Sequence, residues 1–179
     1  LSTPALMLAS CANAETGDSA AQSGEIVATT GPAYPFKTTE VAGLEEPWAI
    51  AFAPGTQMLF VTEKAGTIKV LDTASGKAGT VAGAPEVAYG GQGGLGDVAF
   101  LPAEAGKPLN GRTIYLSWAE AGEGETRGAV VGKGTLACTG VDACAVEGLS
   151  VIWRQTPKVT GRGHYSHRIT FSPDGKYLY

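Results

Sequence analysis

Both histidines of the chain lie in one short segment, GRGHYSHRITF, whose side chains have the types needed for acid–base chemistry. A neutral imidazole such as that of His164 or His167 accepts a proton from a hydroxyl near pH 7. The neighbouring Arg162 and Arg168 can bind carboxylates through paired hydrogen bonds. A histidine is more often structural or surface-exposed than catalytic, but glycines flank this segment and an apolar stretch follows it. We therefore expect a basic loop that leads into a strand and can carry a binding site.

A second segment, GGQGGLGDVAF at residues 90–100, surrounds one amide side chain with glycine. The glycines remove side chains that would keep a flat ligand away from the main chain, and Gln92 then offers an amide donor and an acceptor. A tight turn into a strand needs the same glycines, so the pattern also fits a purely structural loop. A phosphate loop is excluded, because the GxxxxGK[ST] pattern and a following helix are missing.

The elements that would position these loops read as short strands separated by glycine turns. AIAFAP at 49–54, MLFVTE at 58–63 and TIKVLD at 67–72 are apolar or alternating runs of this kind. Such runs, punctuated by glycine, are hairpin signals. We expect a meander of antiparallel strands.

This unit recurs along the chain. Phe52-Ala53-Pro54, Phe100-Leu101-Pro102 and Phe171-Ser172-Pro173 each precede a turn and a second strand containing an aromatic residue. The phenylalanines stand 48 and 71 residues apart, and a period of about 40 to 50 residues is typical of β-propeller blades. An insertion would lengthen the second interval. The expected fold is all-β, with about two four-stranded antiparallel blades and the start of a third; a β-sandwich with a chance repeat is the alternative.

The first residues read as the trailing half of an export signal. LSTPALMLAS precedes Cys11 and is too short to span a bilayer, and LASC matches the bacterial lipobox, in which the cysteine is lipidated. Cleavage of a plain secretory signal after Ala14 is the competing interpretation. We expect an exported protein, periplasmic or anchored to the envelope through Cys11. Residues 1–11 would be the signal remnant, 12–37 a flexible tether and 38–179 the propeller part.

Cys138 and Cys144 lie in LACTGVDACAVEG with five residues between them. Disulfides persist in exported proteins, so we expect a bridge that closes a small glycine-containing loop. Zinc fits less well, because the spacing differs from the usual two-residue hook and no second Cys or His pair follows nearby. The sequence names no metal ligand.

Composition argues against a nucleic-acid partner. Gly supplies 26 of the 179 residues, and charged residues make up 17%, against a typical value of about 25%. The net charge is −4, and no run of Lys or Arg marks a face that could neutralise phosphates. This balance suits many tight turns and short strands.

Three ordered blocks resemble the soluble quinoprotein glucose and aldose sugar dehydrogenases, which depend on pyrroloquinoline quinone (PQQ). The blocks are PWAIAFAP with MLFVTEKAGTIKVLD, GQGGLGDVAFLP with IYLSWAE, and VIWRQTPKV with GHYSHRITFSPDGKYLY. Together they span roughly residues 40–179. The resemblance implies a six-bladed propeller with PQQ across the channel mouth and calcium holding it. It also implies oxidation of aldose sugars at the anomeric carbon to the lactone, with electrons passed to an external acceptor.

The resemblance extends to single residues. His164 stands where the family has its general base, and Gln92 matches a glutamine beside the cofactor. Arg168 aligns with the arginine four residues after the base and would support the cofactor loop. Two departures concern neighbours of the base. Gly163 replaces the Asp of glucose-specific enzymes, which puts glucose specificity in doubt, and His167 replaces a small residue and is expected to face the blade interior.

The chain stops after FSPDGKYLY, at the opening of a strand, so we expect a truncated sequence. The calcium ligands and the partners of the cofactor's carboxylates would then lie in later blades, and residues 1–179 alone would be inactive. Two alternative functions remain open. One is a non-catalytic propeller that serves as a binding module. The other is a calcium-dependent propeller lactonase, although Glu63, Asp72 and Asp97 form no cluster in the sequence that requires it.

Overall fold

The computed structural model describes residues 36–37 and 39–179, and Thr39–Tyr179 form one compact unit. The expected signal remnant with Cys11 lies outside the described residues, as does the expected tether apart from Phe36 and Lys37. Within the described part, no helix is long and apolar enough to span a membrane. The description below concerns the compact unit.

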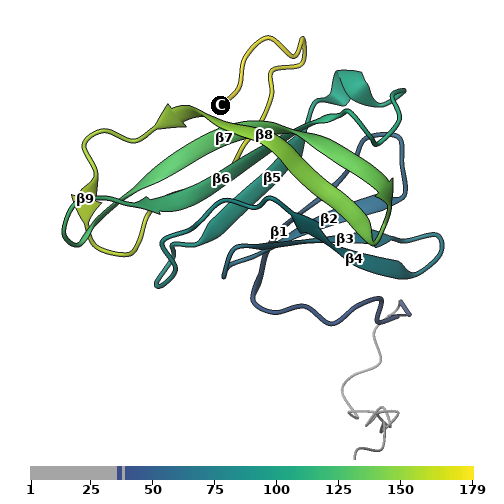
Figure 1. Cartoon of the computed structure of the whole chain (residues 1–179), viewed down its shortest axis with the longest axis horizontal. Helices are drawn as coiled ribbons and strands as arrows, with labels where there is room; N and C mark the ends of the chain where they lie inside the picture. The colour runs from purple at the N-terminus through teal and green to yellow at the C-terminus, as the bar shows by residue number, and fades with distance from the viewer. Residues whose placement is uncertain (1–35, 38) are drawn as a thin grey trace, which may run out of the picture. The chain divides into compact units, whose positions relative to one another are not determined.

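The first blade is a four-stranded antiparallel meander (Figure 1). Its strands are β1 (Pro47–Phe52), β2 (Met58–Glu63), β3 (Thr67–Asp72) and β4 (Lys77–Ala82). The ranges expected for β2 and β3 agree with the structure residue for residue, because alternation and glycine turns mark both ends of each strand. β1 begins two residues earlier than expected, at Pro47.

The second blade repeats the meander with longer outer strands. It consists of β5 (Leu95–Phe100), a single 3₁₀ turn (Pro102–Glu104), β6 (Thr113–Ala121), β7 (Thr126–Gly140) and β8 (Ala143–Arg154). A short strand β9 (Val159–Thr160) pairs with the beginning of β7. The cysteine segment, expected to be a loop, is instead the tip of the β7–β8 hairpin, where Cys138 and Cys144 are cross-strand partners joined by a disulfide.

The two blades join into one sheet. The outer strands β4 and β8 pair in parallel at Val81 and Ala82. This approach depends on glycine, because a Cβ at Gly83, which has φ +78°, would overlap the Val146 carbonyl oxygen. The inner strands β1 and β5 lie side by side, and the Thr62 hydroxyl of β2 donates a 2.6 Å hydrogen bond to the Gly96 carbonyl of β5.

A third blade begins where Phe171 and Leu178 form an isolated antiparallel bridge. The second Phe-x-Pro interval is longer than the first because the extended β7–β8 hairpin and the segment after it lie within it. The expected all-β fold is therefore confirmed, with two four-stranded propeller blades and the start of a third. The core is apolar and draws on both blades, including the outer strands β4 and β8 through Val81, Cys144 and Val146. Its aromatic, leucine and isoleucine members are Phe60, Ile68, Leu95, Phe100, Ile114, Leu116, Trp118 and Leu136.

Arg112 ties the turns of the two blades together at the end of the sheet where β1 and β5 finish. Its side chain is 1% exposed, although arginine is seldom buried. The guanidinium donates to main-chain carbonyls only: to Pro54 at 2.7 Å in the first blade, and to Ala105, Lys107 and Pro108 in the second. The guanidinium thus serves as a hub that joins carbonyl oxygens from the turns of both blades.

Replacing this hub should destabilise the fold strongly. We expect Arg112→Met to lower the free energy of unfolding by about 3 kcal/mol, because the hydrogen bonds of a buried charged donor to four main-chain carbonyls are lost. Lys133→Met removes a cation of similar length from an exposed position on β7 and should change stability by less than about 0.5 kcal/mol. Chemical denaturation of the complete gene product measures both. Equal midpoints for the two variants would contradict the role assigned to Arg112.

Candidate functional site

The two segments singled out from the sequence meet at the end of the sheet where β5 begins. The Gln92 main-chain N–H donates to the Arg162 carbonyl at 2.6 Å. The Gln92 side-chain oxygen in turn accepts a 2.6 Å hydrogen bond from the main-chain N–H of His164. Gly91 permits this contact, since a Cβ there would overlap the Arg162 carbonyl oxygen. The structure therefore brings Gln92 and His164 together although they are 72 residues apart.

The main chain around His164 is strained. His164, Ser166 and His167 have φ of 61°, 62° and 59°, a left-handed region that costs a non-glycine residue of order 1–3 kcal/mol. The His167 N–H donates to the Tyr165 carbonyl at 2.7 Å and the Arg168 N–H donates to the Ser166 carbonyl at 2.8 Å. These are two successive γ-turns with positive φ, a rare conformation. We call residues 164–168 the double turn; it persists only because its surroundings hold it.

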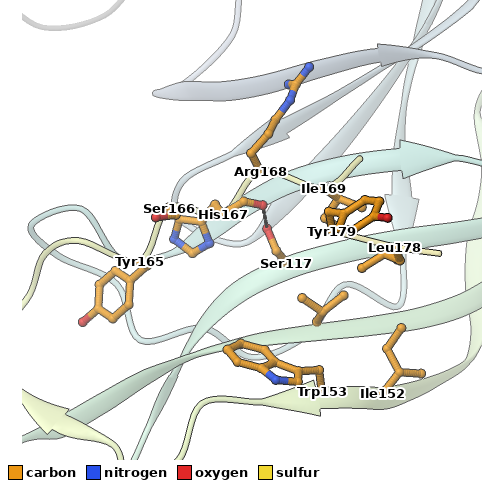
Figure 2. A pocket seen from close by; sticks show the side chains of 11 residues that line it. Ser117, Ile152, Trp153, Tyr165, Ser166, His167, Arg168, Ile169, Leu178 and Tyr179 are labelled. Carbon is orange, nitrogen blue, oxygen red and sulfur yellow. Dashed lines mark hydrogen bonds between the residues drawn. The ribbon is translucent and has the colours of Figure 1, made fainter. Parts of the chain in front are cut away.

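Two buried side chains of the second blade hold the double turn. The Ser117 hydroxyl of β6 donates to the His167 carbonyl at 2.6 Å and accepts from the Asp97 N–H at 2.8 Å. The Asp97 carboxylate of β5 accepts the Ile169 N–H at 2.7 Å. Figure 2 shows Ser117 bonded to the main chain at His167. Asp97 and Ser117 are 3% and 2% exposed, so these bonds lie in a desolvated setting where leaving them unmade is costly.

Side chains of the double turn alternate between solvent and interior. His164, Ser166 and Arg168 are exposed, whereas Tyr165 and His167 are buried. His164 is thus presented outward with its main chain fixed by Gln92. An exposed imidazole on a fixed main chain can meet a substrate hydroxyl and accept its proton.

The ring of His167 points into the molecule. It packs against Tyr165 at 5.6 Å and edge-on to Trp48 at 6.2 Å between ring centroids. Burial lowers the pKa of His167, and the nearby main chain of Gln92 and the Asp97 carboxylate partly offset that effect. Neither ring nitrogen finds a partner with hydrogen-bond geometry among the described residues.

Two exposed arginines flank the site. The Arg168 side chain is 79% exposed and its Nη1 lies 3.8 Å from the Asp97 carboxylate; Figure 2 shows it extending away from the ring of His167. Arg162 lies against Gly90, where its Nη1 would be 3.4 Å from an added Cβ. Both side chains are exposed, and their binding of an anionic group stays a prediction.

A hollow of about 470 Å³ lies on the other side of the double turn, between β7, β8 and the last residues of the chain. Trp153, Ile152 and Tyr179 form part of its mainly apolar lining (Figure 2). His167 borders this hollow, whereas His164 is not among its lining residues. The hollow therefore adjoins the double turn through its other residues, including Arg168, and does not include His164.

Sequence reasoning missed the groups that hold the site. Asp97 was considered only as an unclustered carboxylate, and Ser117 and Trp48 were not considered at all. A signal did exist for Asp97, since a carboxylate in the middle of the apolar strand LGDVAF needs a partner. Nothing in IYLSW distinguishes Ser117 from an ordinary strand serine.

The residues present suit a flat, anionic ligand better than a metal ion. Gly90 and Gly91 expose main chain beside Gln92, and Arg162 and Arg168 provide positive charge. Among the described residues, no group of three or more His, Cys, Asp or Glu side chains could hold a metal ion. The expected calcium therefore has no ligand set in this part of the chain and stays a prediction.

Comparison with known proteins agrees with the resemblance found in the sequence blocks. Residues 44–179 match the family described as Glucose / Sorbosone dehydrogenase. The chain is 34% identical over 137 residues to "Aldose sugar dehydrogenase YliI" of Escherichia coli (strain K12), covering 76% of this chain and 34% of that protein. The chain thus spans about a third of the curated relative it matches.

Solved structures show the same relationship. A crystal structure of glucose dehydrogenase has 39% identity and a TM-score of 0.65, covering 76% of this chain and 37% of its own. The apo form of the soluble aldose sugar dehydrogenase of E. coli has 34% identity and a TM-score of 0.64, covering 75% of this chain and 37% of its own. The PQQ-bound aldose sugar dehydrogenase of Streptomyces coelicolor shares the fold at 24% identity and a TM-score of 0.57. The match covers 74% of this chain and 36% of that one.

The family match covers residues 44–179, which include the two blades and the double turn. The chain therefore belongs to the glucose/sorbosone dehydrogenase family, whose members are sugar oxidoreductases.

Proposed function

We propose that the complete protein oxidises aldose sugars at the anomeric carbon to the lactone, with PQQ as its cofactor and His164 as the general base. One observation carries the proposal: His164 is exposed on a strained, fully anchored turn, and its main chain is bonded to Gln92. Strain that the surroundings hold in place is typical of functional sites. Family membership gives this imidazole its chemistry, because the relatives are named as sugar dehydrogenases.

In this proposal the residues of the chain position the sugar and take its proton. Oxidation of the anomeric hydroxyl removes one proton and one hydride, and neutral His164 accepts the proton. When bound, PQQ supplies the acceptor for the hydride. Gln92 holds His164 in position next to the glycine loop, because its side-chain oxygen accepts the His164 N–H. A base held in position gives a faster reaction than a mobile one, since misplacement by about 1 Å can lower the rate about 100-fold.

The cofactor would be held by the flat main chain of the glycine loop and by exposed cations. PQQ carries carboxylates, and Arg162 and Arg168 are placed to bind them. The side-chain oxygen of Gln92 already accepts the His164 N–H, so the side-chain amide nitrogen of Gln92 is the group left to donate to the cofactor. Calcium and an external electron acceptor belong to the proposal for the complete protein, without residues assigned here.

We also propose that the protein is exported and reaches the periplasm or is anchored to the envelope through a lipid on Cys11. The support is the lipobox-like LASC sequence alone. Labelling of the expressed protein with a radioactive or clickable palmitate tests this, with Cys11→Ser as the control. Export without any label would favour the plain secretory signal.

Removing the base should abolish turnover. We expect His164→Ala, in the complete gene product reconstituted with PQQ and calcium, to reduce an artificial dye with aldoses at least about 100-fold more slowly than the wild type. Cofactor binding, followed by the absorbance of the bound quinone, should persist and shows that the variant is folded. Normal turnover by His164→Ala would exclude the assignment. Quinone-independent hydrolysis of lactones by the wild type would support the lactonase alternative instead.

Loss of the Gln92 anchor should impair catalysis without removing the base. Gln92→Ala leaves the His164 N–H without its acceptor, and we expect kcat to fall by about 10- to 100-fold through misplacement of the imidazole. Gln155→Ala is a matched control, because the Gln155 side-chain oxygen accepts an N–H of the same kind, from Ala129 on β7, at 3.0 Å. If both variants lose activity equally, the effect is general destabilisation rather than positioning of His164.

A further inference from the structure

His167 fills the space between three elements that meet beneath the site. Its side chain is 7% exposed and contacts Trp48 of β1 and Tyr165 of the double turn. Its ring also lies directly on Gly96 of β5, where an added Cβ would overlap Cγ and Nδ1 of the imidazole. Gly96 and His167 are therefore complementary: only a residue without a side chain on β5 leaves room for this ring.

The ring also lies between the two anchors of the double turn. The main chain of Gln92 and the carboxylate of Asp97 both act on His167. Gln92 holds the His164 N–H at one end of the turn, and Asp97 holds the Ile169 N–H at the other. The ring therefore lies close to both residues that anchor the turn.

We propose that His167 is a positioning residue for His164: its buried imidazole is the wedge that keeps the double turn closed over Gly96 and between its two anchors. This inference rests on the proposed function in that His164 is the base. The wedge works through its shape, because the ring fills the space over Gly96. Burial disfavours the charged form of the ring, and the nearby Asp97 carboxylate only partly offsets that effect.

Protonation would also compete with the existing anchor. The titratable and charged groups near the ring are Asp97 on β5 and Tyr165 and Arg168 on the double turn. On β1 the ring meets Trp48, with Lys64 Nζ 6.0 Å from the Trp48 ring. Asp97 is the anion of this set, and its carboxylate already accepts the Ile169 N–H. A charged His167 would draw Asp97 toward itself and weaken that bond.

The sign of the pH effect follows from burial. The pKa of His167 is lowered in the folded protein, with desolvation as the main cause. Below the ordinary value of about 6.5, the unfolded chain takes up a proton that the folded chain resists. The contribution of His167 to stability therefore declines as the pH falls through about 6.5 and is constant above it.

The test uses the complete gene product and three variants: His167→Ala, Gly96→Ala and the double variant. Ala removes the ring but keeps a non-glycine main chain at φ 59°. We expect His167→Ala to lower kcat by about 100-fold with little change in KM, because the base is misplaced while the sugar still binds. Gly96→Ala should do the same by displacing the ring. The double variant should be no worse than His167→Ala, since the collision partner is gone. Multiplicative losses in the double variant, or unchanged kcat in His167→Ala, would overturn the proposal.

A second readout separates the wedge from the proposed function. The denaturation midpoint of the wild type should fall between pH 7.5 and pH 5.5 by more than that of His167→Ala, and Gln155→Ala should behave like the wild type. Equal pH dependence of wild type and His167→Ala would overturn the assignment of this pH effect to the buried ring. A wild type without quinone-dependent activity would instead overturn the proposed function, and the pH comparison together with the Gly96 cycle measured on stability would still decide the wedge.

Discussion

The site depends on two hydrogen bonds that hold the double turn. The Ser117 hydroxyl donates to the His167 carbonyl, and the Asp97 carboxylate accepts from the N–H of Ile169, the residue that follows the turn. Three non-glycine residues with positive φ lie within four positions, and a free loop would relax out of that conformation. Ser117 and Asp97 hold it from one side through the His167 carbonyl and the Ile169 N–H. Both side chains are buried, so breaking either bond would leave an unsatisfied polar group as well as a relaxed loop. The strain of the turn is thus offset by strands of the second blade.

The site belongs to both blades because the inner strands are connected beneath it. Thr62 of the first blade donates to Gly96 of the second, and the next residue along β5 is Asp97. The position of β5 relative to β1 and β2 therefore determines where the carboxylate stands. At the opposite end of the sheet, Arg112 joins the turns of the same two blades. Rigid contacts at both ends leave β5 little freedom, which suits a strand that positions a catalytic loop.

Sequence patterns predicted the strands well and the site only in part. β2 and β3 were expected at their observed ranges, because alternating side chains and glycine turns are local signals. Gln92 and His164 were matched to their positions, and the structure joins them. The segment around Cys138 was expected to be a loop because it contains glycine, but it lies in the fifteen-residue strand β7 and the hairpin that follows. Asp97, Ser117 and the packing of His167 on Gly96 are contacts between distant residues, which periodicity and spacing do not encode.

Charge at the site is arranged so that the positive groups face solvent and the negative group is buried. Asp97 is buried, and its carboxylate accepts the main-chain N–H groups of Val98 and Ile169. The Arg168 side chain beside it is exposed. An anionic ligand approaching the double turn meets the arginines first, because the carboxylate is screened from it by the turn. The anchor that rigidifies His164 therefore does not repel an anionic cofactor, and one buried carboxylate can serve the fold without opposing the proposed chemistry.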